Sequence, residues 1–218
     1  MINKLGNVSL EEIVNFTKGK KPALIDNEEG EGKKPYILIE NFDGKYSSFT
    51  SDKRIPTCNK EDTLLVCDGA RTGLCATGLE GYIGSTLAAI TSKDIEILLP
   101  KYLFYYLKSK TARVREMARG AAIPHLDKDF FLKQQIFLPS LERQMKVVIV
   151  LDTLEFIISS RNKSIPKIQE LKNSFFFEMF GDVVSNNMGW PIEKFQSIGL
   201  LDRGKSRHRP RDAAHLYG

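Results

Sequence analysis

The sequence is poor in the features that define several whole classes of protein. Its 218 residues contain only three cysteines, Cys58, Cys67 and Cys75, and none of them forms a C-x-x-C pair. This spacing argues against a disulfide framework and against a zinc site, and it indicates structural thiols in a reducing compartment. No uncharged apolar run reaches membrane-spanning length, and the N-terminus lacks the apolar core of a signal peptide. We therefore expect a soluble, cytoplasmic protein.

Motifs that carry catalysis are also missing. The Gly-x-Gly at residues 30–32 lacks the third glycine and the following helix of a nucleotide-binding turn. Neither the glycine-rich cofactor turn nor the Asn/Asp-Pro-Pro-aromatic loop of an adenine methyltransferase occurs, and no nucleophile elbow is present. Asp94 and Glu96 are the nearest approach to a nuclease carboxylate cluster, but they alternate with Ile95 and Ile97 as in a half-buried strand. The chain is therefore predicted to be non-catalytic, with no cofactor and no metal of its own.

Apolar and charged residues are present in ordinary amounts. The chain is 42% hydrophobic and 27% charged, which is typical of a folded protein. Its length allows one good core with an appendage. The net charge of +5, with a pI near 9.0, mildly favours an anionic partner.

Residues 1–139 alternate short apolar runs with turns, which predicts one mixed, strand-rich α/β globular domain. Pro100 is expected to start a helix, and Asp127 is expected to cap a short helix over residues 130–132. Strands are expected within residues 35–40, 62–67, 81–90, 95–99 and 135–139.

Residues 140–181 carry a seven-residue apolar repeat, which predicts a long coiled-coil helix that serves as a spacer or a dimer seam. Ser140 is expected at its N-cap and Gly181 at its end. Pro166 removes a backbone donor in the middle, so the segment is predicted to be two consecutive helices or one kinked helix. The predicted seam consists of Val147, Leu151, Leu154, Ile158, Ile165, Ile168 and Phe175.

Residues 182–218 begin like the N-terminal segment. Residues 190–195 and Ile198 match the pattern of residues 8–16, and Gly204 then falls near the position of Gly19, with about two extra residues in between. The match predicts the opening of a second, truncated copy of the domain. Either the protein ends in this opening, or the chain is a truncation of a two-copy protein.

In their order and spacing, these motifs resemble those of type I restriction–modification specificity subunits. The motifs lie at residues 62–65, 68–73, 120–126, 138–144 and 177–182. The resemblance implies a non-catalytic subunit with two target-recognition domains, each reading half of a bipartite DNA site and held apart by antiparallel helices. This chain has one such domain and one spacer, so a homodimer or pairing with another half-subunit is expected.

The resemblance also implies partners and DNA contacts. The partners would be double-stranded DNA, a modification (methyltransferase) subunit that carries S-adenosylmethionine, and the restriction subunit of the complex. Cations in exposed loops would contact phosphates and base edges, although each one also fits an ordinary solvated turn. The candidate DNA contacts are Lys18, Lys20, Lys21, Arg71, Thr72, Arg119 and His125.

The alternative function is a coiled-coil assembly protein whose globular head binds another protein. Lysine and arginine gathered on one face of the head would favour DNA, because phosphate contacts need cations. An apolar patch on that face would favour a protein partner instead.

Overall fold

The computed structural model describes residues 6–117, 125–202 and 204. Its contacts divide the chain into two compact units, Met1–Ile158 and Ser159–Gly218, which we call the head and the tail unit. A long helix, α5 (Leu141–Phe180), crosses the division. The domain boundaries predicted at residues 139 and 181 therefore stay predictions.

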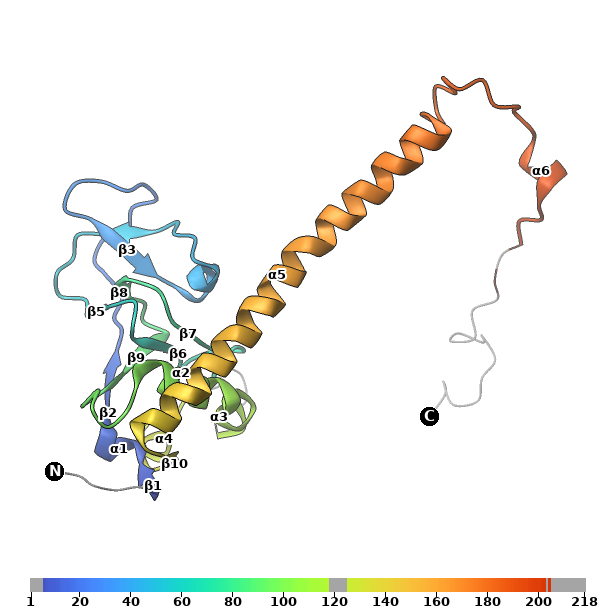
Figure 1. Cartoon of the computed structure of the whole chain (residues 1–218). Coiled ribbons are helices and arrows are strands. Elements are labelled where there is room, and N and C mark those ends of the chain that lie inside the picture. The colour runs from blue at the N-terminus through green and yellow to red at the C-terminus, as the bar shows by residue number, and fades with distance from the viewer. Residues whose placement is uncertain (1–5, 118–124, 203, 205–218) are drawn as a thin grey trace, which may run out of the picture. The chain divides into compact units, whose positions relative to one another are not determined.

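Within the described residues, the head contains two four-stranded sheets and one two-stranded sheet (Figure 1). The two-stranded sheet pairs β1 (Gly6–Ser9) antiparallel with β10 (Gln135–Leu138). The central sheet is antiparallel throughout and has the order β2 (Val14–Lys18), β9 (Leu87–Ser92), β6 (Thr63–Val66), β7 (Cys75–Ala76). The other has the order β4 (Phe49–Thr50), β3 (Lys34–Ile37), β8 (Gly81–Ile83), β5 (Thr57–Cys58), with β3 and β8 parallel.

Short helices complete the head. Pro100 occupies the first turn of α2, as predicted, because its missing N–H costs nothing at that position. The Asp127 side chain accepts a hydrogen bond from the Phe130 N–H at 3.0 Å, which confirms the predicted cap. The helical elements are α1 (Leu10–Ile13), the 3-10 helix η1 (Ile39–Asp43), α2 (Pro100–Ser109), α3 (Thr111–Met117) and α4 (Lys128–Leu132).

The part of the central sheet formed by β6 is buried on both faces, which explains the apolar run at residues 64–66. Leu65 points into a cluster that includes Leu103 of α2 and Phe131 of α4. Its neighbours Leu64 and Val66 point the opposite way, into a second cluster shared with β3 and β8. Successive side chains on a strand face opposite sides, so a strand between two layers needs apolar residues at every position. The head therefore has three layers, with the central sheet between the helices and the second sheet.

The strand predicted at residues 95–99 is wrong, because this segment is a turn. Asp94 accepts hydrogen bonds from Leu98 N–H at 2.9 Å through its carbonyl and from Glu96 N–H at 2.9 Å through its side chain. Such local bonds favour a turn over a sheet ladder. The burial does not alternate as it would in a strand, because Ile95 is 60% exposed and Leu98 is fully buried.

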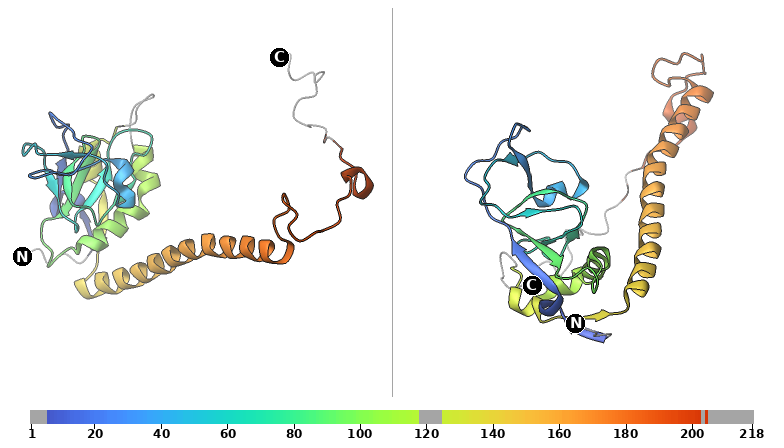
Figure 2. Two further views of the ribbon diagram at one scale, coloured as in Figure 1. Left: turned by 90° about the horizontal axis from the view of Figure 1, so that it is seen from above. Right: turned by 60° about the vertical axis from the view of Figure 1, so that its left-hand side comes forward.

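The long helix α5 runs unbroken from Leu141 to Phe180, including Pro166 (Figure 2). The predicted fresh start before Pro166 does not occur. The hydroxyl of Ser164 donates to the carbonyl of Ser160 at 2.9 Å instead of capping a new helix. Pro166 removes one backbone hydrogen bond, and the helix continues on both sides of it. Gly181, with φ of 72°, ends the helix as predicted.

The tail unit contains the second half of α5, a turn and α6 (Phe195–Ile198). The indole N–H of Trp190 donates to the carbonyl of Phe180 at 2.9 Å, which folds the turn back on the end of α5. Both α1 and α6 are four residues long. Aligning α1 with α6 also aligns Gly19 with Gly204 without a gap. The predicted match uses a different register, with about two extra residues, and the second copy stays a prediction.

Candidate nucleic-acid interface

Topology brings three loops of the head to one edge of the central sheet. Strands β2 and β6 both run antiparallel to β9, which lies between them. Lys18 at the end of β2 therefore stands opposite Ala88, and Val66 at the end of β6 stands opposite Leu87. The loops after β2 and β6 and the turn before β9 meet at this edge. We call residues 18–21, 68–73, 84–86 and 125 the loop edge.

The basic turn at residues 18–21 is fixed to the turn before β9. A Cβ on Gly19 would lie 2.1 Å from the carbonyl oxygen of Gly84, so only glycine allows this approach. The Gly19 N–H donates to the carbonyl of Leu87 at 2.9 Å. Tyr36 from β3 donates its hydroxyl to the carbonyl of Lys20 and accepts from the N–H of Ser85, both at 3.2 Å. The backbone that carries Lys20 is therefore held on a rigid support.

Asp68 joins two of the predicted DNA contacts. Its carboxylate lies 2.6 Å from the Lys18 ammonium and 2.8 Å from Nδ1 of His125. Partial burial would raise the pKa of Asp68, but the hydrogen bonds from Lys18 and His125 outweigh this and lower that pKa below its usual range. The Leu126 N–H also donates to the carbonyl of Cys67 at 2.8 Å, which ties this segment to the end of β6.

The turn at residues 68–73 presents Arg71 and buries Thr72. Gly69 and Gly73 have φ of 98° and 90°, values that favour glycine. The Thr72 hydroxyl donates to the carbonyl of Gly69 at 2.6 Å, and the residue is only 1% exposed. The Thr72 side chain therefore closes the turn, and its contact with DNA stays a prediction. Arg71 stands exposed on the same turn.

The candidate contacts now divide into three groups. Lys20, Lys21 and Arg71 are exposed and form no ion pair within the described residues. Lys18 and His125 are held by Asp68. Arg119 lies outside the described residues. The Asp68 junction was missed by sequence reasoning because its partners are 50 and 57 residues away along the chain.

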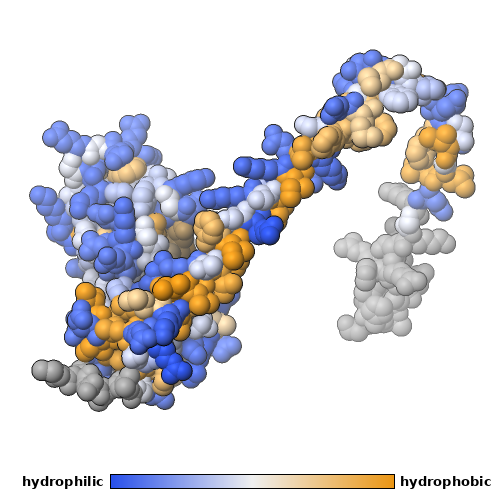
Figure 3. Space-filling model, viewed as in Figure 1, coloured by the Kyte–Doolittle hydropathy of each residue, from blue (hydrophilic) through white to orange (hydrophobic). Residues whose placement is uncertain are grey.

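The predicted seam of α5 is largely uncovered within the chain, and apolar side chains follow the helix in Figure 3. Leu151 is the exception, because it packs half-buried against the core of the head. Val148, outside the predicted seam, packs there as well. Six seam residues are between 38% and 65% exposed, namely Val147, Leu154, Ile158, Ile165, Ile168 and Phe175.

A buried glutamine fastens the start of α5 to the head. Gln144 is fully buried, and its carbonyl oxygen accepts from the N–H of Leu99 at 2.9 Å. Its amide donates to the carbonyls of Ile97 and Pro139 at 2.8 and 2.9 Å. Further along, Asp152 accepts from the Tyr105 hydroxyl at 2.5 Å. The first turns of the helix are therefore part of the head.

Neither the thiols nor the carboxylates of the described residues form a reactive centre. Burial raises the pKa of Cys58 to about 11 and the pKa values of Cys67 and Cys75 to about 12, so the thiolate form is scarce. No group of three His, Cys, Asp or Glu side chains among these residues could hold a metal ion. None of the described helices combines the length and apolarity that crossing a membrane requires.

The profile of the family described as "Type I restriction modification DNA specificity domain" matches residues 3–172. The type I restriction enzyme MjaVIII specificity subunit of Methanocaldococcus jannaschii is 34% identical over 213 residues. That alignment covers 91% of this chain and 50% of the relative, so the chain spans about half the length of the curated relative that it matches.

Solved structures show the same fold at low identity. The S subunit of a type I restriction–modification system from M. genitalium has a TM-score of 0.58 at 18% identity, over 87% of this chain and 50% of that one. The HsdS subunit from Thermoanaerobacter tengcongensis has a TM-score of 0.59 at 21% identity, over 81% and 44%. A structure described for complex assembly of a type I R-M system has a TM-score of 0.63 at 23% identity, over 77% and 42%.

Proposed function

The chain belongs to the type I restriction–modification DNA specificity family, and on that premise we propose that its head binds double-stranded DNA through the loop edge and reads half of a bipartite site. The observation that carries this proposal is the set of exposed cations Lys20, Lys21 and Arg71, which lack ion pairs within the described residues. Because these loops are held on a rigid sheet, the groups that they carry lose little conformational entropy when DNA binds. The chain itself supplies recognition and no catalysis.

The cations of the loop edge are suited to different contacts. Lys20 and Lys21 are exposed on the turn that Gly19 fixes to Gly84, and they are proposed to contact phosphates. Arg71 projects from a turn and is proposed to reach a guanine edge or a phosphate. Asp68 already neutralises Lys18 and orients His125, so these two are proposed as secondary contacts. Arg119 stays a candidate from the sequence.

We further propose that the uncovered seam of α5 pairs with a second copy of the chain or with the equivalent helix of a related half-subunit. Six apolar side chains stand exposed along it, and burying each one is worth roughly 1.5–3 kcal/mol. Antiparallel pairing about a two-fold axis would place two heads at opposite ends, as a symmetric bipartite site requires. The chain spans half of its curated relative, which is the share that one such half would supply.

The remaining partners are proposals from the family. A modification (methyltransferase) subunit that carries S-adenosylmethionine is proposed to dock on the paired chain, and a restriction subunit is proposed to join the same complex. The proposed location is the cytoplasm, where host DNA is accessible. The rival function, a coiled-coil assembly protein with a protein-binding head, is less well supported because the loop edge presents cations and not an apolar patch.

A selection experiment tests the proposed function. The purified chain would be used to select duplexes from a random library, and enrichment of a half-site sequence, or of a symmetric pair with fixed spacing, is expected. The variant Lys20→Ala/Lys21→Ala should recover far less DNA, whereas Lys53→Ala, which removes one exposed charge elsewhere on the head, should behave like the parent chain. Recovery of unenriched library by all three proteins would contradict sequence reading by the head.

A further inference from the structure

The end of α5 forms an apolar hollow with the turn that follows it. The hollow lies wholly in the tail unit and has a volume of about 640 Å³. Phe176 and Phe180 line it from the helix, with ring centroids 5.1 Å apart, and the Trp190 ring lies 6.4 Å from that of Phe180. Two hydrogen bonds of 2.8 Å between the Asn186 side chain and the backbone of Trp190 hold the turn in place. The three aromatic residues are 42–51% exposed, so the described residues leave the hollow open.

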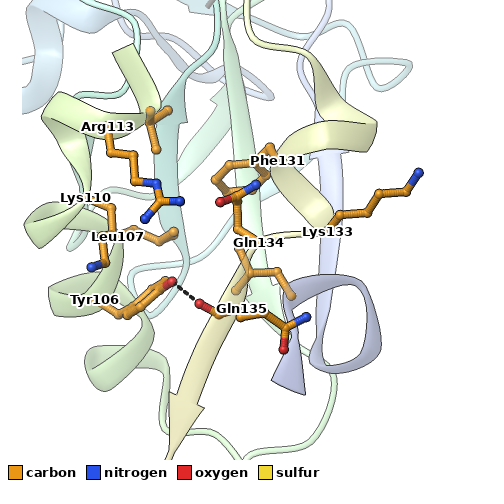
Figure 4. Close-up of a pocket in the computed structure, with 10 residues that line it drawn as sticks. Tyr106, Leu107, Lys110, Arg113, Phe131, Lys133, Gln134 and Gln135 are labelled. Carbon is orange, nitrogen blue, oxygen red and sulfur yellow. Dashed lines mark hydrogen bonds between the residues drawn. The ribbon is translucent and has the colours of Figure 1, made fainter. Parts of the chain in front are cut away.

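One surface of the head matches this hollow in chemistry. Phe137, at an outward position of β10, is 56% exposed and lines a groove together with Arg143 from the first turn of α5. The Tyr102 hydroxyl donates to the carbonyl of Phe137 at 3.0 Å. On the same strand, the carbonyl of Gln135 accepts from the Tyr106 hydroxyl at 2.6 Å (Figure 4). Because the strand is fixed in this way, its exposed aromatic side chain loses little conformational entropy when a partner covers it.

The two surfaces also carry opposite charges. Arg143 is exposed beside Phe137, and the exposed Glu193 lines the hollow of the tail unit. The carboxylate next to Arg143 along the chain, Glu142, is already paired with Lys146 at 2.6 Å. Neither Arg143 nor Glu193 forms an ion pair within the described part of the chain. Opposite charges beside complementary apolar surfaces favour one docking arrangement, because the alternatives bring like charges together.

The seven-residue repeat places these two surfaces on the same side of a helix pair. Val148 packs against the core of the head, and Asp152 accepts from the Tyr105 hydroxyl of the head. Phe176 and Phe180 follow these two residues by four heptads, so they hold the same positions relative to the seam. The two-fold axis of an antiparallel pair is perpendicular to the plane of the two helices, so equivalent residues stay on one side of that plane. The hollow of one copy therefore lies on the side where the head of the other copy is attached.

The midpoint of the seam sets how far along the helices these surfaces lie. Residue 161 is midway between Val147 and Phe175, the first and last residues of the seam. In an antiparallel pair about this midpoint, residues equally distant from it lie opposite each other. Phe180 lies 19 residues after the midpoint, and Arg143 lies 18 residues before it. The hollow of one copy therefore meets the groove on the head of the other copy.

We propose that the hollow of the tail unit receives Phe137 of a second copy of this chain, while Glu193 pairs with Arg143 of that copy. The inference rests on the pairing of α5 proposed above, and it assigns the contact that fixes the direction and register of that pairing. Each dimer would contain two such contacts, one at each end. A parallel pair would leave both hollows at the ends of α5, away from the grooves at its start, and would form neither contact.

Charge reversal tests the contact, with the dimer dissociation constant measured by analytical ultracentrifugation. Arg143→Glu and Glu193→Arg should each weaken the dimer by at least roughly tenfold, because like charges then meet at both contacts. The double variant Arg143→Glu/Glu193→Arg should return close to the parent value. An equimolar mixture of the two single variants should form a mixed dimer about as tight as the parent, because both opposite pairs are restored between the copies. Lys167→Glu, which reverses a charge off the seam, is the control and should leave the constant unchanged.

A second variant tests the apolar part of the contact. Phe137→Ser should weaken the dimer by at least roughly a hundredfold, because two aromatic side chains per dimer lose their burial. Phe130→Ser is the matched control, since Phe130 is 46% exposed on α4, and it should leave the dissociation constant unchanged. Both variants should keep the circular dichroism spectrum of the parent chain, which serves as the check on folding.

Three results would overturn the proposal, and they have different meanings. If the double variant is restored but the mixture of single variants is not, the contact forms within one chain. If the parent chain is a dimer that neither charge reversal nor Phe137→Ser weakens, the pairing of α5 stands and another partner covers the hollow. If the parent chain is a monomer at micromolar concentration, the proposed pairing fails and this contact fails with it.

Discussion

The segments α1 and α6 share a length and an apolar pattern, yet they have opposite environments. Leu10 and Ile13 of α1 are 1% and 3% exposed, whereas Phe195 and Ile198 of α6 are 60% and 72% exposed. In the head, Leu10 donates its N–H to the carbonyl of Gln134, and the core covers its side chain. Within the described residues, α6 has no equivalent cover. A local pattern therefore specifies an element, but burial depends on partners far along the chain.

The two halves of α5 repeat this difference. The first half is fastened by the buried Gln144 and by Leu151 against the core. From Arg161 onward, every residue of the helix is exposed. The head covers its own apolar side chains, whereas those of the tail unit are exposed within the described residues. The first two predictions below test this difference between the halves of α5, and the next two test the loop edge.

The largest effect is expected from charges on the uncovered seam. Ile158→Asp/Ile168→Asp should raise the dimer dissociation constant by roughly a thousandfold or more, because four apolar side chains per dimer lose their burial. Analytical ultracentrifugation measures this directly. Lys167→Asp, on the same helix but off the seam, is the matched control and should leave the dimer intact. A parent chain that is monomeric at micromolar concentration would rule out the pairing.

The second effect concerns the fastened half of the helix. Gln144→Leu should lower the free energy of unfolding of the head by about 3 kcal/mol, because three backbone groups lose their hydrogen-bond partner in a buried place. Urea denaturation followed by circular dichroism reports the change. The same substitution at the exposed Gln169 should alter that free energy by less than about 0.5 kcal/mol. Equal effects at both positions would mean that the head does not hold α5.

A third prediction concerns base reading. Arg71→Ala should relax the selected sequence at one base position, with a loss of about 1–3 kcal/mol in discrimination there. Binding titrations with duplexes that differ at single positions give this value. Arg54→Ala, which removes an arginine paired with Asp52, is the control. A uniform loss across all sequences would instead assign Arg71 to a phosphate.

The smallest effect is a pH dependence at the Asp68 junction. The pKa of Asp68 is lowered in the fold, so its contribution to stability is present above the unfolded pKa of about 4 and is lost as the pH falls through the folded value. In Asp68→Asn, the free energy of unfolding should therefore fall less steeply with decreasing pH in this range. The control is Glu61→Gln, which removes an exposed carboxylate that has no ion pair in the described residues. This variant should show the same pH dependence of the unfolding free energy as the parent chain. If Asp68→Asn leaves the pH dependence of the unfolding free energy unchanged, the ion pairs of Asp68 do not stabilise the fold.

Sequence patterns predicted secondary-structure elements better than they predicted contacts between distant residues. The strand β6, the start of α2 at Pro100 and the cap at Asp127 followed from periodicity and local chemistry. The strand prediction for residues 95–99 failed because the alternating sequence there folds as a turn, which local hydrogen bonds to Asp94 hold. Pro166 failed as a break because one lost hydrogen bond in a helix of 40 residues is tolerated.

The candidate site was predicted only in part. A basic turn and a glycine-bounded turn can be recognised in a sequence, so Lys20, Lys21 and Arg71 were proposed from it, and the structure shows them exposed. Their meeting at one edge depends on β9 lying between β2 and β6, which no local pattern encodes. The burial of Thr72 follows from the fold of its own turn, where its hydroxyl bonds the carbonyl of Gly69. Gln144 looked like any polar residue on a helix until its three partners were visible.

The most direct test of the account is the salt dependence of duplex DNA binding by the purified chain. Phosphate contacts release counterions, so the logarithm of the association constant should fall linearly with the logarithm of salt concentration, by about 0.9 per phosphate contacted. Lys20→Ala/Lys21→Ala should weaken binding to every sequence and reduce this slope by roughly one to two, while Lys53→Ala should leave it unchanged. A slope and an affinity that are the same in all three proteins would contradict DNA binding through the loop edge.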